Sequence, residues 1–527
     1  MSHKALTPLS FLRRSAEVWS SKIAVIDGDR RWTYAKFGSE VQRVARALRA
    51  SGVKPGDRVA TLMPNVAEML VAHFAVPLAG AVLVPVNTRL SSSEVNYILG
   101  HSGAKVLLAD TRLSDLADRS VEGLDGIECV HVGSEPDERG AWAAFLDRAA
   151  GETKDLPWTV ADEESPIAIN YTSGTTGRPK GVVYTHRGAY LNSLGELIHS
   201  QHSPASVYLW TLPMFHCNGW CTTWAVTGIG GTHVCLPEVR GEAVWNAIDT
   251  YGVTHLNAAP TVVTTILNAA EATSLKTPVR VTTAGAPPSP TMIGHLDRMG
   301  FSLVHVYGLT ETYGPYAVCE VQPEWEVLAP GERSRLLSRQ GVGMIQADEL
   351  RVVDETMHDV PNDGATVGEI VMRGNNVMAE YYLDPEGTRE AFRGGWFHSG
   401  DLGVRHPDGY VQLRDRAKDI VISGGENIST IEVEQALVSH PAVMEAAVIG
   451  VPDEKWGERP RGYVLLKSDH TVTGPELVAH VQQQIARYKA PREVMVVKAL
   501  PKTSTGKIQK FVLREEAWAG RGERIQG

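Results

Sequence analysis

Residues 171–181 constrain this chain more than any other part of its sequence. Glycines, hydroxyl side chains and two cations occupy nearly all of these positions. Such a segment cannot form a hydrophobic core, but its glycines let backbone N–H groups approach a phosphate closely, and Lys180 adds positive charge. The order of residues differs from the ordinary P-loop, because Pro179 precedes the lysine and a glycine follows it. Apolar runs at 167–169 and 182–184 predict strands on both sides, so we expect a fixed phosphate-binding loop rather than a flexible surface loop.

Six further motifs follow this segment in order along the chain. They are Ala284-Gly285-Ala286-Pro287, Tyr307-Gly308-Leu309-Thr310-Glu311-Thr312, Ser399-Gly400-Asp401-Leu402-Gly403, Arg416-Ala417-Lys418-Asp419, Ser423-Gly424-Gly425-Glu426-Asn427-Ile428 and Pro501-Lys502-Thr503-Ser504-Thr505-Gly506-Lys507. One such motif alone is a weak indication, whereas the ordered series is specific. On these residues the chain resembles the adenylate-forming (ANL) superfamily, which includes acyl-CoA synthetases, luciferases and the adenylation domains of peptide synthetases. The resemblance covers most of the chain.

The resemblance implies a two-step ligase. ATP would activate a carboxylic acid to an acyl-adenylate with release of pyrophosphate, and transfer to coenzyme A would then give acyl-CoA and AMP. In the first step an anion must attack an already anionic α-phosphate, so lysines and Mg²⁺ are expected to supply positive charge. No carrier-protein segment follows Lys507, so coenzyme A is the expected acceptor and a carrier protein or another nucleophile is the alternative.

Three functions of other kinds stay open on the sequence. One is a luciferase-like oxidative enzyme that acts on an adenylate. A second is an ATP-dependent ligase with an unusual nucleophile, or one that activates a group other than a carboxylate. The third is a catalytically silent nucleotide-binding module, which the presence of Lys180, Glu311, Asp401 and Lys507 disfavours.

The resemblance also implies roles for individual residues in the adenylation step. The residues expected at the β- and γ-phosphates are Thr172, Ser173, Gly174, Thr175, Thr176, Gly177 and Lys180. Those expected around adenine and the rest of AMP are Gly285, Ala286, Pro287, Tyr307, Gly308, Thr310, Asp401 and Arg416, with Asp401 on the ribose hydroxyls. Thr176 and Glu311 would lie near Mg²⁺, since hydroxyl and carboxylate oxygens are ligands that this ion prefers. Lys507 would bridge the carboxylate and the α-phosphate.

A second set of residues is implied for thioester formation and acid binding. The C-terminal domain would rotate about Lys418, and Ser423, Gly424 and Gly425, followed by Glu426, would then line the tunnel for the thiol. The expected acyl pocket consists of His216, Trp220, Ala258, Ala284 and Tyr313, with His216 as an aromatic gate counted among the catalytic residues. Residues 215–220 contain no acid to pair with an α-ammonium group, so an α-amino acid is disfavoured. Tryptophans and little charge favour an apolar acyl group of modest size.

Alternating helical and strand-like segments predict an α/β fold. We expect a large N-terminal domain of layered, mostly parallel sheets and helices at 1–415, a hinge at 416–420, and a small mobile α+β domain at 421–527. Predicted strands are 22–27, 58–63, 82–86, 105–110, 303–306, 443–450 and 494–497, and predicted helices are 34–51, one that follows a capping box of Ser429 and Glu432, and one that begins at Pro475. The charged run at 414–419 suits either a solvated helix face or an exposed linker. Asp401 is expected in a turn.

Bulk composition limits the remaining possibilities. A chain of 527 residues exceeds one compact core, and a net charge of −10 argues against nucleic-acid binding. Five irregularly spaced cysteines do not form a disulfide framework, so we expect a reducing cytoplasm. The apolar stretch 69–86 is interrupted by prolines and a glycine, and predicts a buried helix and strand rather than a membrane span. A homodimer is left open.

Overall fold

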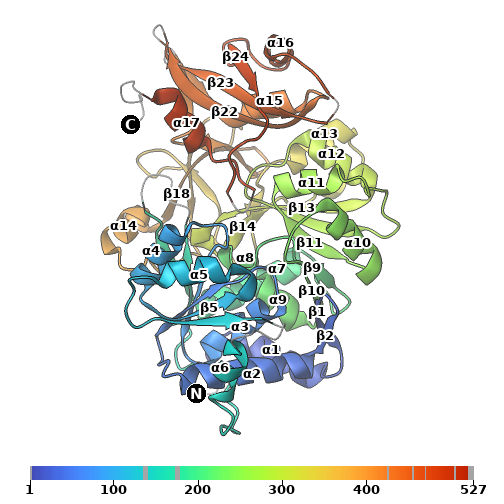
Figure 1. Cartoon of the computed structure of the whole chain (residues 1–527). Helices are drawn as coiled ribbons and strands as arrows, with labels where there is room; N and C mark the ends of the chain where they lie inside the picture. Colours follow the sequence, from blue (N-terminus) through green and yellow to red (C-terminus); the bar gives the residue numbers. More distant parts are fainter. Residues whose placement is uncertain are drawn as a thin grey trace.

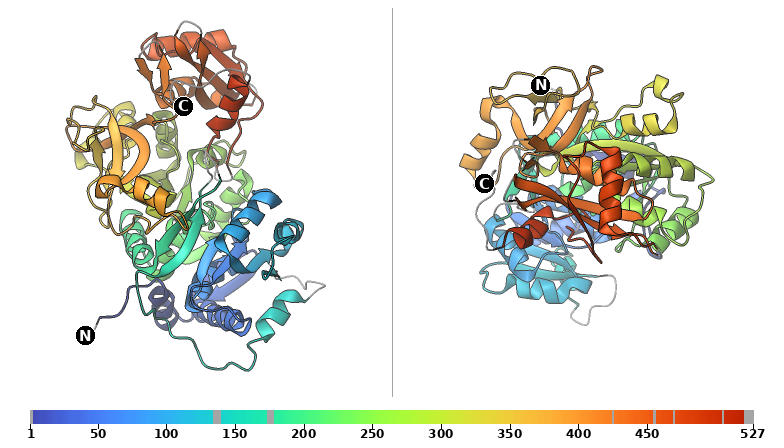
Figure 2. Two further views of the ribbon diagram at one scale, coloured as in Figure 1. Left: turned by 90° about the vertical axis from the view of Figure 1, so that its left-hand side faces the viewer. Right: turned by 90° about the horizontal axis from the view of Figure 1, so that it is seen from above.

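The computed structural model describes residues 3–133, 140–172, 178–423, 426–453, 456–468, 470–503 and 506–519. A large N-terminal unit carries three sheets, and a smaller C-terminal unit lies at one end of it (Figure 1). Figure 2 shows from two further sides that the C-terminal strands and helices stay together at that end. The expected combination of a large α/β unit with a small α+β unit is therefore confirmed.

The first sheet has six strands in the order β6-β5-β3-β4-β7-β8. Its strands are β3 (Arg58–Leu62), β4 (Val82–Pro85), β5 (Ala104–Asp110), β6 (Glu128–Val132), β7 (Pro166–Tyr171) and β8 (Gly181–Thr185). They are parallel except for β7 and β8, which pair antiparallel on either side of the glycine-rich segment. The associated helices are α2 (Tyr34–Ala50), α3 (Ala67–Leu78), α4 (Ser92–Ser102), α5 (Ser114–Val121) and α6 (Ala141–Asp147).

The second sheet has nine strands in the order β15-β14-β13-β12-β11-β9-β10-β1-β2. These are β1 (Ile23–Asp27), β2 (Arg30–Thr33), β9 (Val207–Leu209), β10 (Thr232–Cys235), β11 (His255–Ala258), β12 (Val279–Thr283), β13 (Phe301–Leu309), β14 (Gly314–Val318) and β15 (Val342–Gly343). Its middle is parallel and its two margins are antiparallel. Its helices are α1 (Leu9–Val18), α7 (His186–His199), α9 (Thr222–Ile229), α10 (Gly241–Tyr251), α11 (Pro260–Leu267), α12 (Pro290–Met299) and α13 (Pro330–Leu337). The short element labelled α8 (Cys217–Trp220) is a left-handed turn.

The third sheet of this unit is antiparallel, which the sequence analysis did not anticipate. It consists of β16 (Arg351–Val353), β17 (Gly368–Met372), β18 (Phe397–Arg405) and β19 (Val411–Arg416), with α14 (Pro385–Ala391) between β17 and β18. One hydrophobic cluster runs from Leu9 through Trp224 to Val411, so the three sheets share a core.

The C-terminal unit has a core of its own, which begins at Val421 and includes Val448 and Leu477. It is built from β20 (Val421–Ser423), β21 (Glu426–Ile428), β22 (Val443–Asp453), β23 (Gly457–Leu466), β24 (Glu493–Val496), α15 (Thr430–Val438), α16 (Gly474–Gln484) and α17 (Lys510–Trp518). Thr473 and Glu476 form a reciprocal capping box at the start of α16, which explains why the helix begins beside Pro475.

Several local expectations are wrong in detail. Ser429 does cap α15, but Glu432 does not complete the box, because its carboxylate pairs with Lys489 at 2.8 Å. The strand expected at 303–306 continues to Leu309. Asp401 lies within β18 rather than in a turn. Gly400, at φ 67°, makes the strand irregular at this point but does not end it.

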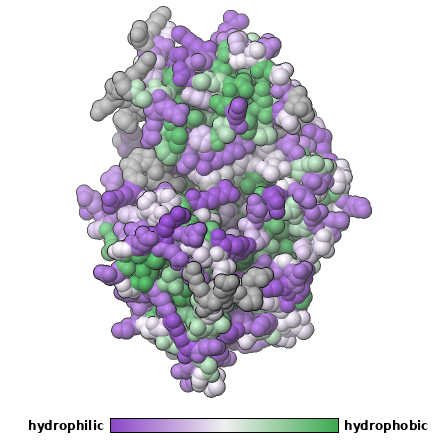
Figure 3. Space-filling view, in the orientation of Figure 1, coloured by the Kyte–Doolittle hydropathy of each residue, from purple (hydrophilic) through white to green (hydrophobic). Residues whose placement is uncertain are grey.

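The surface has the mixture of hydrophilic and apolar residues that is typical of a globular protein (Figure 3). Hydrophilic residues dominate the face in Figure 3, and apolar residues form separate patches on it, one of them over the C-terminal unit. Helix α3 is mostly apolar, and all of its residues except Glu68 are buried, as expected for a core helix. Among the described residues, no helix is both long and apolar enough to cross a bilayer.

Candidate active site

Three parallel neighbours of the second sheet end at the same edge. Strands β11, β12 and β13 deliver Ala258, Ala284 and Tyr307 there, because carboxyl ends of parallel strands lie side by side. Gly285 and Ala286 follow β12 and are exposed, with Gly285 at φ 91°, where an L side chain would be strained. The edge therefore offers small, accessible residues next to a buried tyrosine.

The third sheet brings two charged residues to that tyrosine. Tyr307 donates a hydrogen bond of 2.7 Å to Asp401 Oδ2, and Arg416 Nε lies 3.1 Å from Asp401 Oδ1. Asp401 and Arg416 face each other in the register of β18 and β19, which explains a meeting of residues fifteen positions apart. Burial first, and then Asp401, raises the pKa of Tyr307 well above its usual value, so the phenol remains a donor.

Lys507 reaches the same place from the C-terminal unit. The lysine is accessible to solvent, so the like charge of Arg416, more than loss of water, lowers its pKa to about 7. Its turn is closed by a bond of 2.7 Å from Thr503 N–H to the Lys507 carbonyl. Gly506, at φ 83°, lies against α11, since a Cβ there would sit 2.2 Å from Thr261 Oγ1. A glycine thus allows the lysine turn to contact the large unit closely.

Lys507 lies close enough to His216 to shift the pKa of its imidazole. Burial, and secondly the charge of Lys507, lower the pKa of His216 to about 4, so the imidazole is neutral at physiological pH. The structure brings together Tyr307, Asp401, Arg416, Lys507 and His216, which span almost three hundred residues of sequence.

The segment after His216 adopts a left-handed turn that the sequence analysis missed. All five residues from Cys217 to Cys221 have positive φ, between 45° and 62°. Each non-glycine residue in this conformation costs about 1–2 kcal/mol, so the surroundings must hold the turn in place. Asn170 does so from β7, accepting from Asn218 N–H at 3.2 Å and donating to Asn218 Oδ1 at 2.5 Å.

This turn directs a tryptophan toward the end of β12. Trp220 is 5% exposed and shares a hydrophobic cluster with Ala284 and Val306. A Cβ at Gly314 would lie 2.8 Å from its ring, so the indole has no room on that side. Tyr313 lies in a different environment: it is fully buried, stacks on Tyr184 at 4.0 Å, and accepts a hydrogen bond of 2.6 Å from Thr185 N–H.

A second group of polar residues surrounds Glu311, and sequence reasoning missed two of its members. Tyr381 donates a hydrogen bond of 2.9 Å to Glu311 Oε1. Lys180 lies over the Tyr381 ring at 4.6 Å and pairs with Asp384 at 2.9 Å. Tyr381 is positioned because Val182 of β8 forms a bridge with it. The pair Asp384-Pro385 is a sequence pattern typical of a helix start, but nothing in the local sequence predicts that Asp384 contacts Lys180.

The half-buried carboxylate of Glu311 has a raised pKa, mainly because it is partly removed from water. A cation beside it would stabilise its charged form, so this residue fits one oxygen ligand of Mg²⁺. Thr310 lies next to it, and its carbonyl accepts a hydrogen bond of 2.5 Å from Tyr184.

The remaining members of the expected set fall partly outside the described residues. Thr172 is described, and its N–H donates to the Lys180 carbonyl at 3.0 Å, so the segment between them is closed at its base. The expected residues outside the described ranges are Ser173, Gly174, Thr175, Thr176, Gly177, Gly424 and Gly425. Pro287 follows Ala286, Gly308 lies in β13, and Ser423 ends β20.

The charged run before the C-terminal unit is not an exposed linker or a solvated helix. Asp415 is 1% exposed and accepts hydrogen bonds from Thr430 N–H at 2.6 Å and its hydroxyl at 2.7 Å. Asp419 pairs with Arg514 of α17. Lys418, between them, is half-buried, and burial followed by the charge of Arg416 lowers its pKa to about 8. The charges in this segment are used in contacts between the two units.

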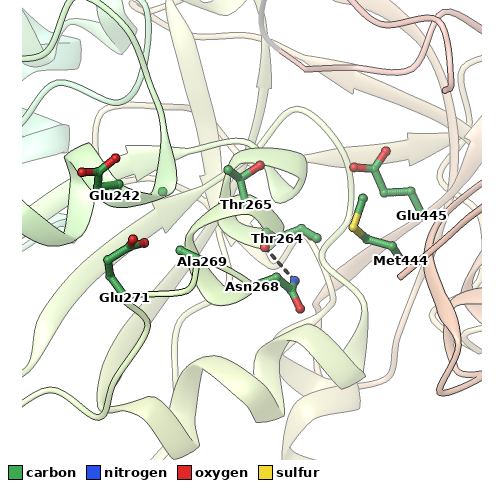
Figure 4. Close-up of a pocket in the computed structure, with 9 residues that line it drawn as sticks. Glu242, Thr264, Thr265, Asn268, Ala269, Glu271, Met444 and Glu445 are labelled. Carbon is green, nitrogen blue, oxygen red and sulfur yellow. Dashed lines mark hydrogen bonds between the residues drawn. The ribbon is translucent and has the colours of Figure 1, made fainter. Parts of the chain in front are cut away.

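A cavity of about 360 Å³ lies elsewhere on the boundary between the units (Figure 4). Its walls come from α10, α11 and β22, with Glu242, Glu271 and Glu445 among them. Three carboxylates disfavour an anionic ligand, and none of the expected site residues lines it. It marks incomplete packing between the units rather than the reaction centre.

Comparison with known proteins identifies the class to which this fold and site belong. The model of the AMP-binding enzyme family matches residues 12–382, and that of the AMP-binding enzyme C-terminal domain matches residues 432–507. The chain belongs to the AMP-binding enzyme family.

Several members of the class are similar over their full length. The acetate–CoA ligase CCL3 of Humulus lupulus is 44% identical over 98% of this chain and 95% of its own. The peroxisomal acetate/butyrate–CoA ligase AAE7 of Arabidopsis thaliana is 43% identical over the same shares. Among solved structures, the anthranilate CoA ligase AuaEII in complex with anthranoyl-AMP superposes with a TM-score of 0.85, at 26% identity over 98% of both chains.

Proposed function

We propose that this chain joins a short apolar carboxylic acid to coenzyme A in two steps. In the first, a carboxylate oxygen attacks the α-phosphorus of ATP, a phosphorus–oxygen bond forms, and pyrophosphate leaves. In the second, the thiol of coenzyme A attacks the acyl carbon, and AMP departs with the oxygen that came from the acid. The observation that carries the proposal is the arrival of Lys507 beside Arg416, Asp401 and Tyr307.

For adenylation we assign charge stabilisation to two cations. Lys507 and Arg416 would hold the acid carboxylate and the α-phosphate together, which lowers the repulsion between the two anions. Asp401, fixed by Tyr307 and Arg416, would accept the ribose hydroxyls. Residues 285–287 would line one side of the adenine, because their small side chains leave room for a flat ring.

At the other end of the triphosphate, Lys180 and the segment 172–177 would bind the β- and γ-phosphates. Glu311 and Thr176 would hold Mg²⁺, whose charge neutralises the leaving pyrophosphate. Tyr381 would fix the Glu311 carboxylate. Asp384 would pair with Lys180 until the phosphates of ATP take the place of Asp384.

For thioester formation, Lys507 must leave so that the thiol can approach the same acyl carbon. We propose that residues 421–527 rotate as a body about Lys418, relative to residues 1–415. Support comes from the separate core that begins at Val421 and from the incompletely packed boundary in Figure 4. Ser423 would then line the thiol tunnel together with Gly424 and Gly425.

The proposed acid is short. Trp220 packs against Ala284, and Ala258 ends the neighbouring strand, so a pocket formed by these residues would be apolar and shallow. Similar ligases act, by their names, on acetate, on butyrate and on 2-methylpropanoate, which agrees with this size. His216, neutral and close to Lys507, would close the pocket toward the nucleotide. Tyr313, which packs on Tyr184, would support the pocket from behind.

Product analysis tests the reaction. The protein is incubated with ATP, Mg²⁺, coenzyme A and an acid panel from acetate to octanoate with benzoate and cinnamate, and products are identified by mass. We expect AMP, pyrophosphate and acyl-CoA, with ¹⁸O from labelled acid appearing in AMP. Formation of ADP with the label in inorganic phosphate would refute the adenylate.

A second set of outcomes separates the alternatives for the acceptor. AMP and pyrophosphate without a thioester would indicate a carrier protein or another nucleophile, and oxygen uptake would indicate an oxidative enzyme. The absence of nucleotide turnover with every acid would favour a silent nucleotide-binding module.

We also propose a reducing compartment, the cytoplasm, and leave a homodimer open. All five cysteines are free thiols, and four of them are buried. Two similar ligases are named as peroxisomal, so the location is tested directly by fractionation of cells that express the chain.

A further inference from the structure

The N-terminal unit contains a second cluster of side chains with the chemistry of metal ligands. Asp118, Cys129 and His131 each direct one ligand atom into a space where all three atoms lie within 4.8 Å of one another. Within the described ranges this is the one group of three or more such residues, and none of its members has a part in the reaction proposed above.

The local fold explains why these residues meet. Cys129 and His131 are two positions apart on β6, so their side chains leave the same face of the strand. Ser114 and Asp118 are four positions apart on α5 and share one face of that helix. Helix α5 packs on β6, the edge strand of the six-stranded sheet, so the two faces come together.

The imidazole of His131 has a polar neighbour at each ring nitrogen. Ser114 Oγ lies 3.0 Å from Nδ1, and Asp118 Oδ1 lies 2.9 Å from Nε2. In the absence of a metal, Nε2–H can donate to the carboxylate while the Ser114 hydroxyl donates to Nδ1. A metal ion at Nε2 would take the place of that proton. The ring would then carry its proton on Nδ1, where the Ser114 oxygen can accept it while its hydroxyl donates to the Thr111 carbonyl at 2.9 Å.

We propose that these three residues bind a divalent transition-metal ion, with Zn²⁺ as the best match, through His131 Nε2, Cys129 Sγ and Asp118 Oδ1. Zinc bonds of about 2.0–2.3 Å place tetrahedral ligand atoms about 3.3–3.6 Å apart. The nitrogen lies 2.9 Å from the carboxylate oxygen and 4.0 Å from the sulfur, so movements of less than 1 Å reach that geometry. The thiol releases its proton on binding, and water completes the coordination. The Ser114 oxygen fixes the ring from behind, as outer-shell partners of metal-bound histidines do.

The exposure of the three ligands leaves a path by which an ion can reach the site from solvent. The His131 side chain is 8% exposed, whereas that of Asp118 is 48% exposed, so the ligands run from the protein interior to the solvent. A thiolate and an imidazole select transition metals over Mg²⁺, so this site would not compete with Glu311 for the same ion. Because the ion would tie α5 to the sheet edge, its expected effect is on the stability of the N-terminal unit.

The test is a titration of the metal-free, full-length protein with Co²⁺, which reports a sulfur ligand through thiolate-to-metal charge transfer. We expect one equivalent to give a near-ultraviolet charge-transfer band and visible bands of four-coordinate Co²⁺, both displaced by Zn²⁺. Zn²⁺ should also raise the melting temperature of the wild type.

Two variants and one matched control decide the ligand set. Cys129→Ser should abolish the charge-transfer band, and Asp118→Asn should weaken Zn²⁺ binding about tenfold or more. Asp115→Asn removes an exposed carboxylate three residues earlier on the same helix and should leave affinity unchanged. Acyl-CoA formation should be the same in all three. Absence of the band in the wild type, which would leave only a hydrogen bond between His131 and Asp118, overturns the proposal. Unaltered Zn²⁺ affinity in Asp118→Asn or Cys129→Ser does so as well.

Discussion

Two segments that meet at the candidate active site are held in opposite ways. The turn 217–221 is buried, strained and tied by Asn170 to the strand that precedes the glycine-rich segment. Lys507, in contrast, is accessible, and its neighbour Gly506 touches the large unit at Thr261. The first can define the shape of a pocket, whereas the second can deliver charge and withdraw it. We infer that rigidity and mobility are divided between them because the two half-reactions need the same pocket but different neighbours.

The largest expected effect comes from removing the charge of Lys507. Lys507→Ala should slow adenylation about 10²- to 10³-fold, because one electrostatic contact to the transition state is lost. Thioester formation from added acyl-adenylate should stay within about threefold of the wild type, a split that pyrophosphate release and acyl-CoA formation measure separately. Lys498→Ala, at an exposed lysine of the same unit, is the control. Equal loss of both half-reactions would mean that Lys507 has a general structural role.

Blocking the rotation should give the reverse split. Lys418→Pro fixes the backbone at the proposed hinge, so thioester formation from added adenylate should fall about 100-fold, as expected for misplaced groups. Adenylation should persist, since this structure already places Lys507 beside Arg416. Lys418→Ala keeps the backbone free and should resemble the wild type. Full thioester turnover in the proline variant would rule out this hinge.

A change in the rigid turn should alter the choice of acid. Trp220→Gly opens space next to Ala284 and suits the φ of 57° at this position. The ratio of kcat/KM for hexanoate to that for acetate should rise about tenfold, since each buried methylene contributes about 1–3 kcal/mol to discrimination. Trp220→Phe, which keeps most of the bulk, should leave the ratio near that of the wild type. An unchanged ratio in the glycine variant would place the end of the pocket elsewhere.

Two glycine substitutions compare the segments directly. Gly219→Ala brings a Cβ to 2.7 Å from the buried ring of Trp210 and should lower the free energy of unfolding by about 1–3 kcal/mol. Gly506→Ala meets Thr261 instead, and its turn can move away, so unfolding should change by about 1 kcal/mol or less while adenylation falls about tenfold. Urea unfolding and pyrophosphate release give the two numbers. Similar losses of stability in both variants would contradict the proposed division.

The smallest expected effect is on pH dependence. The lowered pKa of about 7 means that Lys507 is protonated below this pH and neutral above it. Adenylation needs the cation, so kcat/KM for that half-reaction should fall about fivefold between pH 7 and pH 8. The rate of thioester formation from added adenylate should not fall in this pH range. Arg416→Gln removes the positive charge that lowers the pKa of Lys507, so the fall in kcat/KM should move to higher pH. A pH profile that does not move would mean that another group titrates.

The order of motifs predicted much of the fold and a large part of the candidate site. Strands at β7 and β8, the core helix α3 and the strand β22 were all legible, because their apolar runs have the length and period of the elements they form. The structure also brings Tyr307, Asp401 and Arg416 into contact. The roles of these residues remain predictions that the variants above test.

Other features depended on contacts between distant segments. Asp415 and Asp419 read as solvated charges, but each finds a partner in the C-terminal unit, which no local pattern announces. Glu432 does not complete the expected capping box, because its carboxylate pairs with Lys489, which is distant in the sequence. Tyr381 reached Glu311 only through its bridge to β8.

By itself, the sequence determined the class of fold, the succession of elements and the chemical types gathered for nucleotide binding, since periodicity and short motifs act over a few residues. Only the tertiary structure decided the left-handed turn at 217–221 and the lowered pKa of Lys507. Both arise from long-range causes: Asn170 and Trp210 hold a backbone that local preferences oppose, and the guanidinium of Arg416 acts across ninety residues of chain.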